Sequence, residues 1–334
     1  MKKVFNIIKY LFFLGVGIAL FYYVYRGLGV ETIASKMKEI SWGWIWLSFV
    51  FAILSHLSRA IRWNMLIRPL GYNPGVVNTF FSIIIMYFTN LIIPRGGELA
   101  RCTILSKYDK IPFTKLAGTV FIERATDTLF LLILVLITIL SQIVVFRQFV
   151  ANNQAFGQKL GILLSPWLWI ILIITSFLFI YILWKNRERL KKIKALSKTI
   201  DLIRNFIEGI KSISKLEHPW RYVGHSVFIY VMYFLMMYVV FFSYGPTIHM
   251  TIIAGLTAFI MGGLAMLAPV QGGIGAWHFM VLETLSLYGL DKTDGKIFAL
   301  ISHTSMNLMI LIVGALCFAA LPLLNRKIAK NHQK

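Results

Sequence analysis

The stretch "NLIIPRGGELAR" runs from Asn90 to Arg101, at the end of an apolar segment that begins at Val76. It places a proline, two glycines and three charged side chains where a membrane segment is expected to end or to turn. An ionised side chain at mid-bilayer costs about 3 kcal/mol on insertion scales, so charges in such a place need a reason. Lys107, Lys110 and Lys115 follow this stretch and are expected in the cytoplasm, on the same side from which the apolar segment at Val76 enters the membrane. Residues 76–106 therefore predict either two unequal helices or a re-entrant hairpin with PRGGE near its tip.

Composition sets the class of protein. The chain has 334 residues, of which 58% are hydrophobic and 14% charged, whereas soluble domains are about 25% charged. Several apolar runs reach the roughly 20 residues that cross a bilayer as a helix, and the alternation of a barrel strand is absent. Cys102 and Cys317 lie far apart in apolar contexts and indicate neither a disulfide framework nor a metal cluster. We predict an all-α, polytopic membrane bundle.

The net charge of +21 raises the alternative of nucleic-acid binding. The basic residues gather between the apolar runs, as the positive-inside bias predicts, so nucleic acid is excluded as a partner. The lysines at the N-terminus precede a long apolar run, residues 7–25, without a cleavage site of small residues. We interpret this run as an uncleaved first helix. The expected location is the cell (inner) membrane, with multiple passes and with both the N- and C-termini cytoplasmic.

The order of apolar runs predicts about six full spans and two broken hairpins in one domain, residues 1–334. The spans are expected at residues 7–25, from 42 onward, and at 116–146, 162–184, 222–242 and 296–321. A polar segment, Arg26 to Ser41, is expected as an external connection. The second span is expected to return inside, where Arg59, Arg62 and Arg68 stand.

A second broken segment, residues 251–289, contains "PVQGGIG" from Pro269 to Gly275. It is predicted to enter from the outside, opposite to the hairpin at residues 76–106. The two occupy corresponding places in the halves 1–147 and 222–324, which predicts an inverted repeat with a midplane site. Glycine permits tight turns and proline frees a carbonyl. The predicted turn residues are Pro94, Gly96, Gly97, Pro269, Gly272, Gly273 and Gly275.

The most basic part of the chain, residues 185–221, is predicted to be cytoplasmic. Its apolar positions follow helical spacing. Two interpretations stay open: an amphipathic helix attracted to anionic headgroups of the inner leaflet, and a solvated helix that only connects the halves.

Two clusters of charge accompany the first hairpin. Arg95, Glu98 and Arg101 are spaced three apart and share a helix face. Glu123, Arg124 and Asp127 follow in the next span. In one interpretation the arginines line a cavity and bind an anionic headgroup by bidentate hydrogen bonds, while the acids orient them or carry protons. In the other, the six charges pair among themselves and lock the hairpin to the next helix.

The second half has polar rather than charged candidates. His303 and Asn307 share a helix face, and His278 could titrate near neutral pH, although a buried histidine is more often a hydrogen-bonded structural residue. Glu283 is a further polar candidate. The predicted substrate-binding residues are Asn90, Arg95, Glu98, Arg101, Glu123, Arg124, Asp127, Gln271, His278 and His303. No catalytic residue, metal site or cofactor is predicted.

Four ordered motifs carry a resemblance that spans nearly the whole chain. They are "SRAIRWNMLIRPLG" (58–71), "NLIIPRGGELARCTIL" (90–105), "FIERATDTL" (121–129) and "APVQGGIGAWHF" (268–279). The chain resembles the lysylphosphatidylglycerol synthase transmembrane family, also called the flippase-like domain family. The resemblance implies an integral membrane module that handles phospholipid or polyprenyl-linked headgroups.

The family's patterns fall on particular residues here. Its first polar pattern falls on Asn90, Pro94, Gly97, Glu98 and Arg101, and its Glu-Arg-x-x-Asp pattern falls on Glu123, Arg124 and Asp127. Where many members have an Arg-Glu pair after the second glycine turn, this chain has Trp277-His278. The soluble aminoacyl-transferase domain of the full synthases is expected to be missing.

Three functions follow as alternatives. The first is a lipid transporter or flippase that moves a phospholipid or polyprenyl-phosphate headgroup through a polar cavity. The second is a membrane enzyme on a lipid-linked phosphate or sugar, with Glu123 or Asp127 as base, although no nucleophile elbow, metal spacing or nucleotide motif is present. The third is a non-transporting partner of a lipid-modifying enzyme. Membrane lipids are expected partners, and a homodimer stays open.

Overall fold

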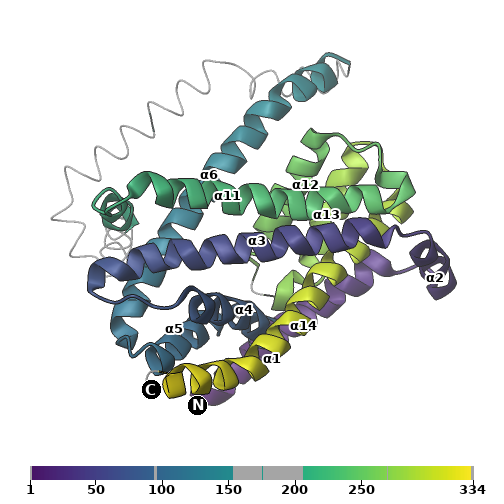
Figure 1. Cartoon of the computed structure of the whole chain (residues 1–334). Helices are drawn as coiled ribbons and strands as arrows, with labels where there is room; N and C mark the ends of the chain where they lie inside the picture. The colour runs from purple at the N-terminus through teal and green to yellow at the C-terminus, as the bar shows by residue number, and fades with distance from the viewer. Residues whose placement is uncertain (1, 94–95, 153–174, 176–205, 269, 332–334) are drawn as a thin grey trace. The chain divides into compact units, whose positions relative to one another are not determined.

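The computed structural model describes residues 2–93, 96–152, 175, 206–268 and 270–331 (Figure 1). Regular structure in these residues is helical, which confirms the all-α class for the part of the chain described. The α-helices are α1 (Lys2–Tyr25), α2 (Val30–Lys38), α3 (Trp42–Ile67), α4 (Val76–Ile92), α5 (Gly97–Tyr108), α6 (Phe113–Asn152), α11 (Pro219–Tyr238), α12 (Ile252–Ala265), α13 (Ala276–Leu287) and α14 (Lys292–Asn331). Short 3-10 helices are η1 (Arg68–Leu70), η2 (Val239–Ser243), η3 (Gly245–Thr247) and η4 (Gln271–Gly273).

The chain divides into two compact units. One consists of residues 1–131 and 215–334, and the other of residues 132–214. Both predicted hairpins and both charged motifs belong to the first unit. Most of the basic segment 185–221 lies outside the described residues; of the part described, residues 206–213 are helical and residues 219–221 begin α11.

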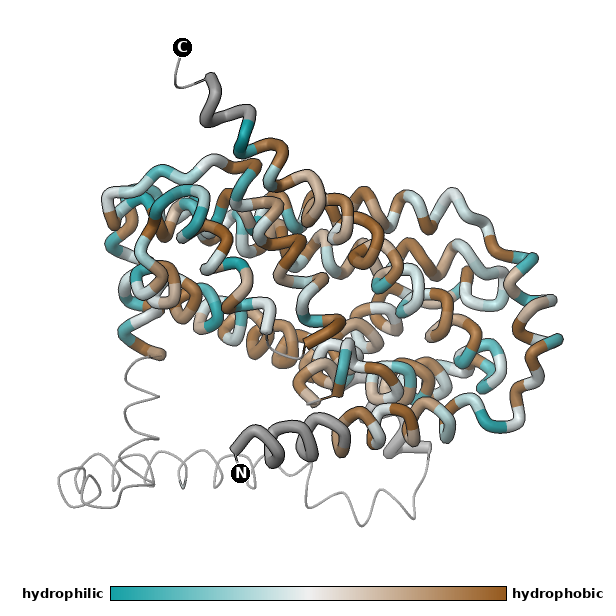
Figure 2. The backbone as a smooth tube through the Cα atoms, turned by 90° about the horizontal axis from the view of Figure 1, so that it is seen from below, coloured by the Kyte–Doolittle hydropathy of each residue, from teal (hydrophilic) through white to brown (hydrophobic). Residues whose placement is uncertain are grey.

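Three helices among the described residues are long and apolar enough to cross a membrane: 42–70, 219–243 and 292–326. A fourth span is counted if Phe12–Tyr25 and α2, which are bent by 77° to each other, form one. Figure 2 shows hydrophobic residues along much of the length of the helices, with hydrophilic residues at many of the helix ends and connections. The predicted span at 162–184 falls almost entirely outside the described residues, so the count of six spans stays a prediction.

The segment expected as an external connection, Arg26 to Ser41, contains helix α2. Ile33 and Met37, four residues apart in α2, both pack against the hydrophobic core. Glu31 lies in the first turn and Lys38 in the last, which suits the helix dipole. The sequence predicted no helix in this segment, because two apolar positions are too few to dominate its composition.

Helices α3 and α11 run side by side and form the centre of the first unit (Figure 1). Ser48, Ala52 and Ser55 of α3 are buried, and residues this small let two helix backbones approach closely. The Ser48 hydroxyl donates to the carbonyl of Met236 at 2.6 Å. This contact fixes the register of α3, whose later turns carry two buried arginines.

The first broken segment is a helical hairpin of α4 and α5. The amide of Gly97 donates to the Asn90 side-chain oxygen at 2.9 Å. A Cβ atom on Gly97 would lie 2.1 Å from the carbonyl oxygen of Met86, so only glycine permits this approach of the two helices. Gly96 has φ −74°, so neither turn glycine here adopts a left-handed conformation. Pro94 and Arg95 lie outside the described residues.

The second broken segment is a hairpin of α12, η4 and α13. Gly272, Gly273 and Gly275 all have positive φ, which glycine adopts without strain. A Cβ on Gly275 would lie 2.5 Å from the carbonyl oxygen of Gly17, so this turn also packs tightly against α1. Pro269 lies outside the described residues.

The tips of the two hairpins meet. The Gln271 side-chain amide donates to the carbonyl of Ile92 at 3.4 Å, and the position of a Cβ on Gly272 lies 3.5 Å from Leu91. These residues are about 180 positions apart in the chain, so the contact joins its two halves. Entry of the hairpins from opposite sides of a membrane, and the inverted repeat, stay predictions.

Candidate functional site

Seven charged side chains from three helices gather beside the first hairpin. We call them the charge cluster; its members are Arg59 and Arg62 of α3, Glu98 and Arg101 of α5, and Glu123, Arg124 and Asp127 of α6. The two predicted charge motifs are thus brought together. They are joined by two arginines from a third helix.

Glu123 lies at the centre of the charge cluster and is completely buried. It accepts from Arg101 Nη1 at 2.7 Å, from Arg124 Nη2 at 2.9 Å and from Arg59. Arg62 Nη2 donates to the same carboxylate at 3.3 Å. A buried carboxylate held this way stays ionised because several guanidinium groups replace its water.

Asp127 lies one turn further along α6. It accepts from Arg62 Nη2 at 2.6 Å and from Arg59 Nη1 at 2.9 Å, and Arg124 Nη2 lies 3.0 Å from it. Four guanidinium groups therefore face three carboxylates, so the charge cluster carries one positive charge in excess.

Arg101 is sealed inside the protein. Its side chain is 0% exposed, and its guanidinium carbon lies 4.4 Å from the centre of the Trp63 ring. The Trp63 indole is fixed in turn by donating to Thr119 Oγ1 at 2.9 Å. Glu98 Oε2 lies 2.7 Å from Arg101 Nη2. Arg101 therefore ties α5 to α6 and α3 and has no open face for a ligand.

Arg124 and Glu98 form the open edge of the charge cluster. The Arg124 side chain is 41% exposed and that of Glu98 is 29% exposed, whereas the other three arginines are at most 4% exposed. Arg124 Nη1 lies 3.4 Å from Glu98 Oε1, and Arg124 Nε has no hydrogen-bond partner. This guanidinium can therefore accept a further anionic partner.

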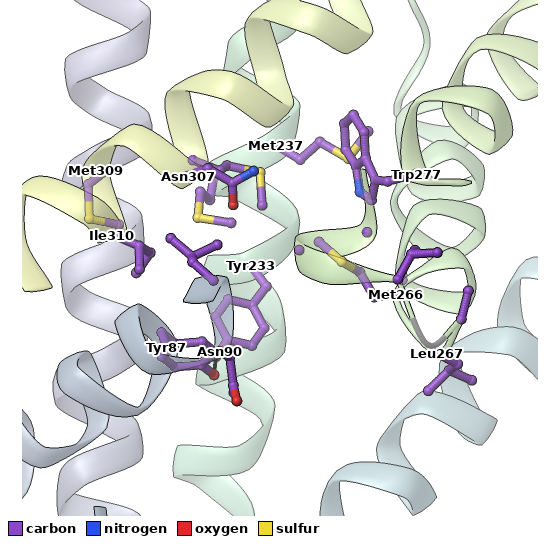
Figure 3. A pocket seen from close by; sticks show the side chains of 18 of the residues that line it. Tyr87, Asn90, Tyr233, Met237, Met266, Leu267, Trp277, Asn307, Met309 and Ile310 are labelled. Atoms are coloured by element: carbon purple, nitrogen blue, oxygen red, sulfur yellow. Dashed lines mark hydrogen bonds between the residues drawn. The ribbon is translucent and has the colours of Figure 1, made fainter. Parts of the chain in front are cut away.

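Both open side chains line a cavity of about 740 Å³ between the hairpin tips, α11 and α14 (Figure 3). Its wall is mostly apolar, with polar groups contributed by a few residues. The polar and aromatic lining residues are His56, Tyr87, Asn90, Glu98, Arg124, Tyr233, Phe259, Trp277 and Asn307. Of the predicted substrate-binding residues, Asn90, Glu98 and Arg124 line this cavity.

Two tyrosines connect the cavity wall to the charge cluster. The hydroxyls of Tyr87 and Tyr233 lie 2.8 Å apart, and Arg59 Nε donates to the Tyr233 hydroxyl at 3.3 Å. The ring of His56 lies over that of Tyr87, with centroids 4.6 Å apart. Sequence reasoning overlooked these three residues, because none belongs to a charged motif.

His278, His303 and Gln271 support the second hairpin. His303 Nε2 donates to the carbonyl of Gly272 at 2.7 Å, which leaves Nδ1 to accept from Asn307 at 3.1 Å. His278 Nδ1 accepts from the Gly275 amide at 3.3 Å. The centroids of the two imidazole rings lie 4.5 Å apart. Both histidines therefore pack together on the glycine turn and hydrogen-bond to its backbone.

Replacing His303 with leucine is expected to loosen the second turn. The buried carbonyl of Gly272 would lose its donor, at a cost of about 1–3 kcal/mol. Hydrogen–deuterium exchange of residues 270–275 should rise, while exchange at α3 stays unchanged. His303→Gln should restore part of the protection, because a glutamine amide also donates. Equal exchange in His303→Leu and wild type would contradict this role.

Arg59 and Arg62 correct the sequence interpretation. They were expected on the inner side after the second span, but they lie within α3 and are 3% and 0% exposed. The apolar run from Trp42 continues past them without a helix breaker, and this continuity is the signal that could have placed them in the bundle. Arg68, by contrast, is exposed on η1.

No group of three His, Cys, Asp or Glu within the described residues is arranged to hold a metal ion. The three carboxylates of the charge cluster are instead engaged by arginines. The cavity therefore presents one open guanidinium, paired with the Glu98 carboxylate, beside neutral hydrogen-bonding groups and apolar side chains.

Long apolar helices, broken hairpins and a buried ionic cluster define a multi-pass helical membrane protein. Residues 6–314 match the family described as the lysylphosphatidylglycerol synthase TM region, and the chain belongs to this family. It is similar to UPF0104 membrane protein MJ1595 of Methanocaldococcus jannaschii, with 23% identity over 92% of each chain. It is also similar to a UPF0104 membrane protein of Methanothermobacter thermautotrophicus, with 20% identity over 80% of this chain and 82% of that protein. No solved structure matches the chain.

Proposed function

We propose that this protein is a lipid transporter of the flippase type. It would move a phospholipid or polyprenyl-phosphate lipid, with an anionic or zwitterionic headgroup, through the cavity between its hairpins. The observation that carries the proposal is the open guanidinium of Arg124, which lines the cavity at the edge of a buried cluster with one positive charge in excess. Membership of the lysylphosphatidylglycerol synthase TM family supports a role with membrane lipids.

The electrostatics favour an anionic ligand. An unbalanced buried charge is costly in a low-dielectric interior, and an incoming anion removes the imbalance. A guanidinium presents two parallel donors to a phosphate, which gives both direction and strength. A phosphate group at Arg124 would therefore neutralise the charge cluster without disturbing Glu123, whose carboxylate stays with Arg59, Arg62 and Arg101.

Binding also offers a way to move a hairpin. The contact from Arg124 to Glu98, at 3.4 Å, is long compared with the other ion pairs of Arg124, which measure 2.9 and 3.0 Å. An anion at Arg124 would compete with Glu98, which lies in the first turn of α5. Release of that carboxylate would weaken the attachment of the α4–α5 tip, and departure of the anion would restore it.

The same geometry disfavours acid–base catalysis by the predicted carboxylates. Glu123 and Asp127 each accept from two or more arginines, so both are held in the ionised state and are weak bases. A membrane enzyme acting on lipid-linked phosphate or sugar, and an accessory subunit, remain the alternatives that an experiment must separate from transport.

Replacing Arg124 with alanine is expected to reduce headgroup translocation by about 10- to 100-fold, because one charge-assisted interaction with the headgroup is lost. The charge cluster would then hold three arginines and three acids, so the variant should stay folded. The measurement is the loss of fluorescence, on addition of dithionite, of headgroup-labelled phosphatidylglycerol in liposomes containing the purified protein. Arg68→Ala, which removes an exposed arginine of η1, should translocate like wild type.

Wild-type translocation by Arg124→Ala would contradict the proposal and leave Arg124 as a structural residue. Formation of a new lipid product without translocation would favour the enzyme. The proposal places the protein in the cell membrane with both termini in the cytoplasm, and accessibility labelling of cysteines introduced at each end tests that orientation.

A further inference from the structure

We propose, as an extension of the transport function, that the cavity takes in the headgroup of an amphiphile together with the adjoining part of its hydrocarbon chains. Its single acidic group would lie at Arg124, and the first part of its hydrocarbon chains would lie against a wall of methionines. The ligand would therefore enter with part of its tail, unlike a lipid whose headgroup alone travels through the protein while the tail stays in the bilayer.

The wall opposite the charged edge is apolar and deformable. We call it the methionine wall; its members are Met236 and Met237 of α11, Met266 after α12, and Met306 and Met309 of α14. Methionine is unbranched and polarisable, so it adapts to ligands of irregular shape. Phe259 and Trp277 complete this wall. A cavity that admits only a phosphate headgroup has no need of such a surface.

The charged lining residues lie at one end of the cavity, and the other end is mostly apolar, with Asn307 as a polar side chain among the methionines. Figure 3 shows Tyr87 and Asn90 at one end, and Met237 and Trp277 at the other. Asn90 binds the amide of Gly97, next to Glu98, which pairs with Arg124. The charged edge therefore adjoins the Asn90 end. This division of the lining matches the division of an amphiphile into head and tail.

A buried histidine adds a group with unused hydrogen-bonding capacity. His56 lines the cavity, its residue surface is 4% exposed, and its Nδ1 has no hydrogen-bond partner. Such groups are rare in folded proteins and call for a partner. A phosphate or glycerol oxygen of the headgroup would supply one. His56 lies one helical turn before Arg59, so it belongs to the same end as the charge cluster.

The size of the cavity agrees with this ligand. Its volume of about 740 Å³ falls within the range of roughly 300–1,000 Å³ that is usual for sites holding drug-sized ligands. A phosphate group fills a small part of this space, and the remainder lies along the methionine wall.

Gly263 provides a way to fill the apolar end without damage to the fold. It lines the cavity on α12, and a Cβ at this position meets nothing within 4 Å. Gly263→Leu is therefore expected to place its side chain in the cavity and improve the helix propensity of α12. Gly224→Leu is the matched control, since Gly224 is an exposed glycine of α11 whose Cβ position is equally open.

The test uses phosphatidylglycerol with brominated acyl chains, added to the full-length protein in detergent micelles. Trp277 is 3% exposed, so bromine atoms reach it closely only from inside the cavity. Exposed tryptophans such as Trp42 and Trp220 are quenched in both proteins, so the signal is the difference in quenching between wild type and Trp277→Phe, which should saturate. Arg124→Gln and Gly263→Leu should each weaken the apparent affinity by about tenfold or more, while Gly224→Leu retains it. sn-Glycerol 3-phosphate, which is a headgroup without chains, should compete weakly.

Two results would overturn the inference: equal quenching in wild type and Trp277→Phe, or equal affinities in Gly263→Leu and Gly224→Leu. Tight competition by sn-glycerol 3-phosphate would also do so, since it would show that the headgroup suffices. If the protein gives one of these results but still translocates lipid in liposomes, the proposed transport function is retained and only the inference that the tail binds in the cavity is wrong. Saturable quenching without translocation would retain the amphiphile site and remove the transport function.

Discussion

Replacing Glu123 with alanine is expected to destabilise the protein by about 3–5 kcal/mol, because it leaves buried arginines without their shared partner. Three of the four guanidinium groups that contact Glu123 belong to side chains at most 4% exposed, so water cannot replace the carboxylate. The net charge of the charge cluster would rise from +1 to +2, because four arginines would then face two carboxylates. Helices α3, α5 and α6 would all lose part of what holds them together.

The measurement is the unfolding temperature in detergent, monitored as the fraction of protein that remains monodisperse on size-exclusion chromatography after heating. Glu283→Ala is the matched control: its carboxylate pairs with Lys292 at 3.5 Å on the surface, and such pairs contribute about 0–1 kcal/mol. Combining Glu123→Gln with Arg101→Met should recover part of the loss, because it removes a charge of each sign. An unfolding temperature for Glu123→Ala equal to that of Glu283→Ala would refute the central role of Glu123.

Replacing Gly97 with alanine is expected to separate the helices of the first hairpin. The new methyl group would lie 2.1 Å from the carbonyl oxygen of Met86 and 2.8 Å from the side-chain oxygen of Asn90. Backbone atoms cannot rotate away, so α5 must move as a unit, at a cost of about 3 kcal/mol, the upper end of the usual range for overpacking. Because α5 carries Glu98 and Arg101, the displacement should also reduce transport, by about tenfold or more.

Gly118→Ala separates the steric effect from a general effect of glycine replacement. Gly118 lies in α6 with nothing within 4 Å of its Cβ position, so alanine should be neutral or slightly stabilising there. Unfolding temperature and translocation are measured for both variants. Comparable values for Gly97→Ala and wild type would mean that α4 and α5 do not pack as closely as the structure shows.

Much of the fold follows from local sequence. Apolar length predicts the helices, and the glycines and prolines predict breaks at both hairpins, because each of these signals acts on neighbouring residues. The motifs that hold Glu98, Arg101, Glu123, Arg124 and Asp127 also predict that charges gather beside the first hairpin. The local sequence does not reveal which of these charged side chains is accessible to a ligand, because exposure depends on how separate helices pack.

The burial of Arg59 and Arg62 in α3 could not be predicted from local sequence, because their partners are distant in the chain. Arg59 and its partner Glu123 are 64 residues apart, and the charge-counting rule places an unpaired arginine outside the membrane. The contact between Gln271 and Ile92 spans 179 residues and likewise leaves no local signature. The cavity is formed by this contact together with α11 and α14, so neither its size nor its methionine lining can be read from any one segment.

The packing of Gly275 against Gly17 has a consequence for biogenesis. Helix α1 is synthesised well before the turn that it supports, because Gly17 precedes Gly275 by more than half of the sequence. At about 5–20 residues per second, roughly 10 to 50 seconds separate the two. During synthesis the face of α1 around Gly17 therefore contacts lipid or the insertion machinery, and the second turn acquires its final packing only when residues 270–275 dock onto α1.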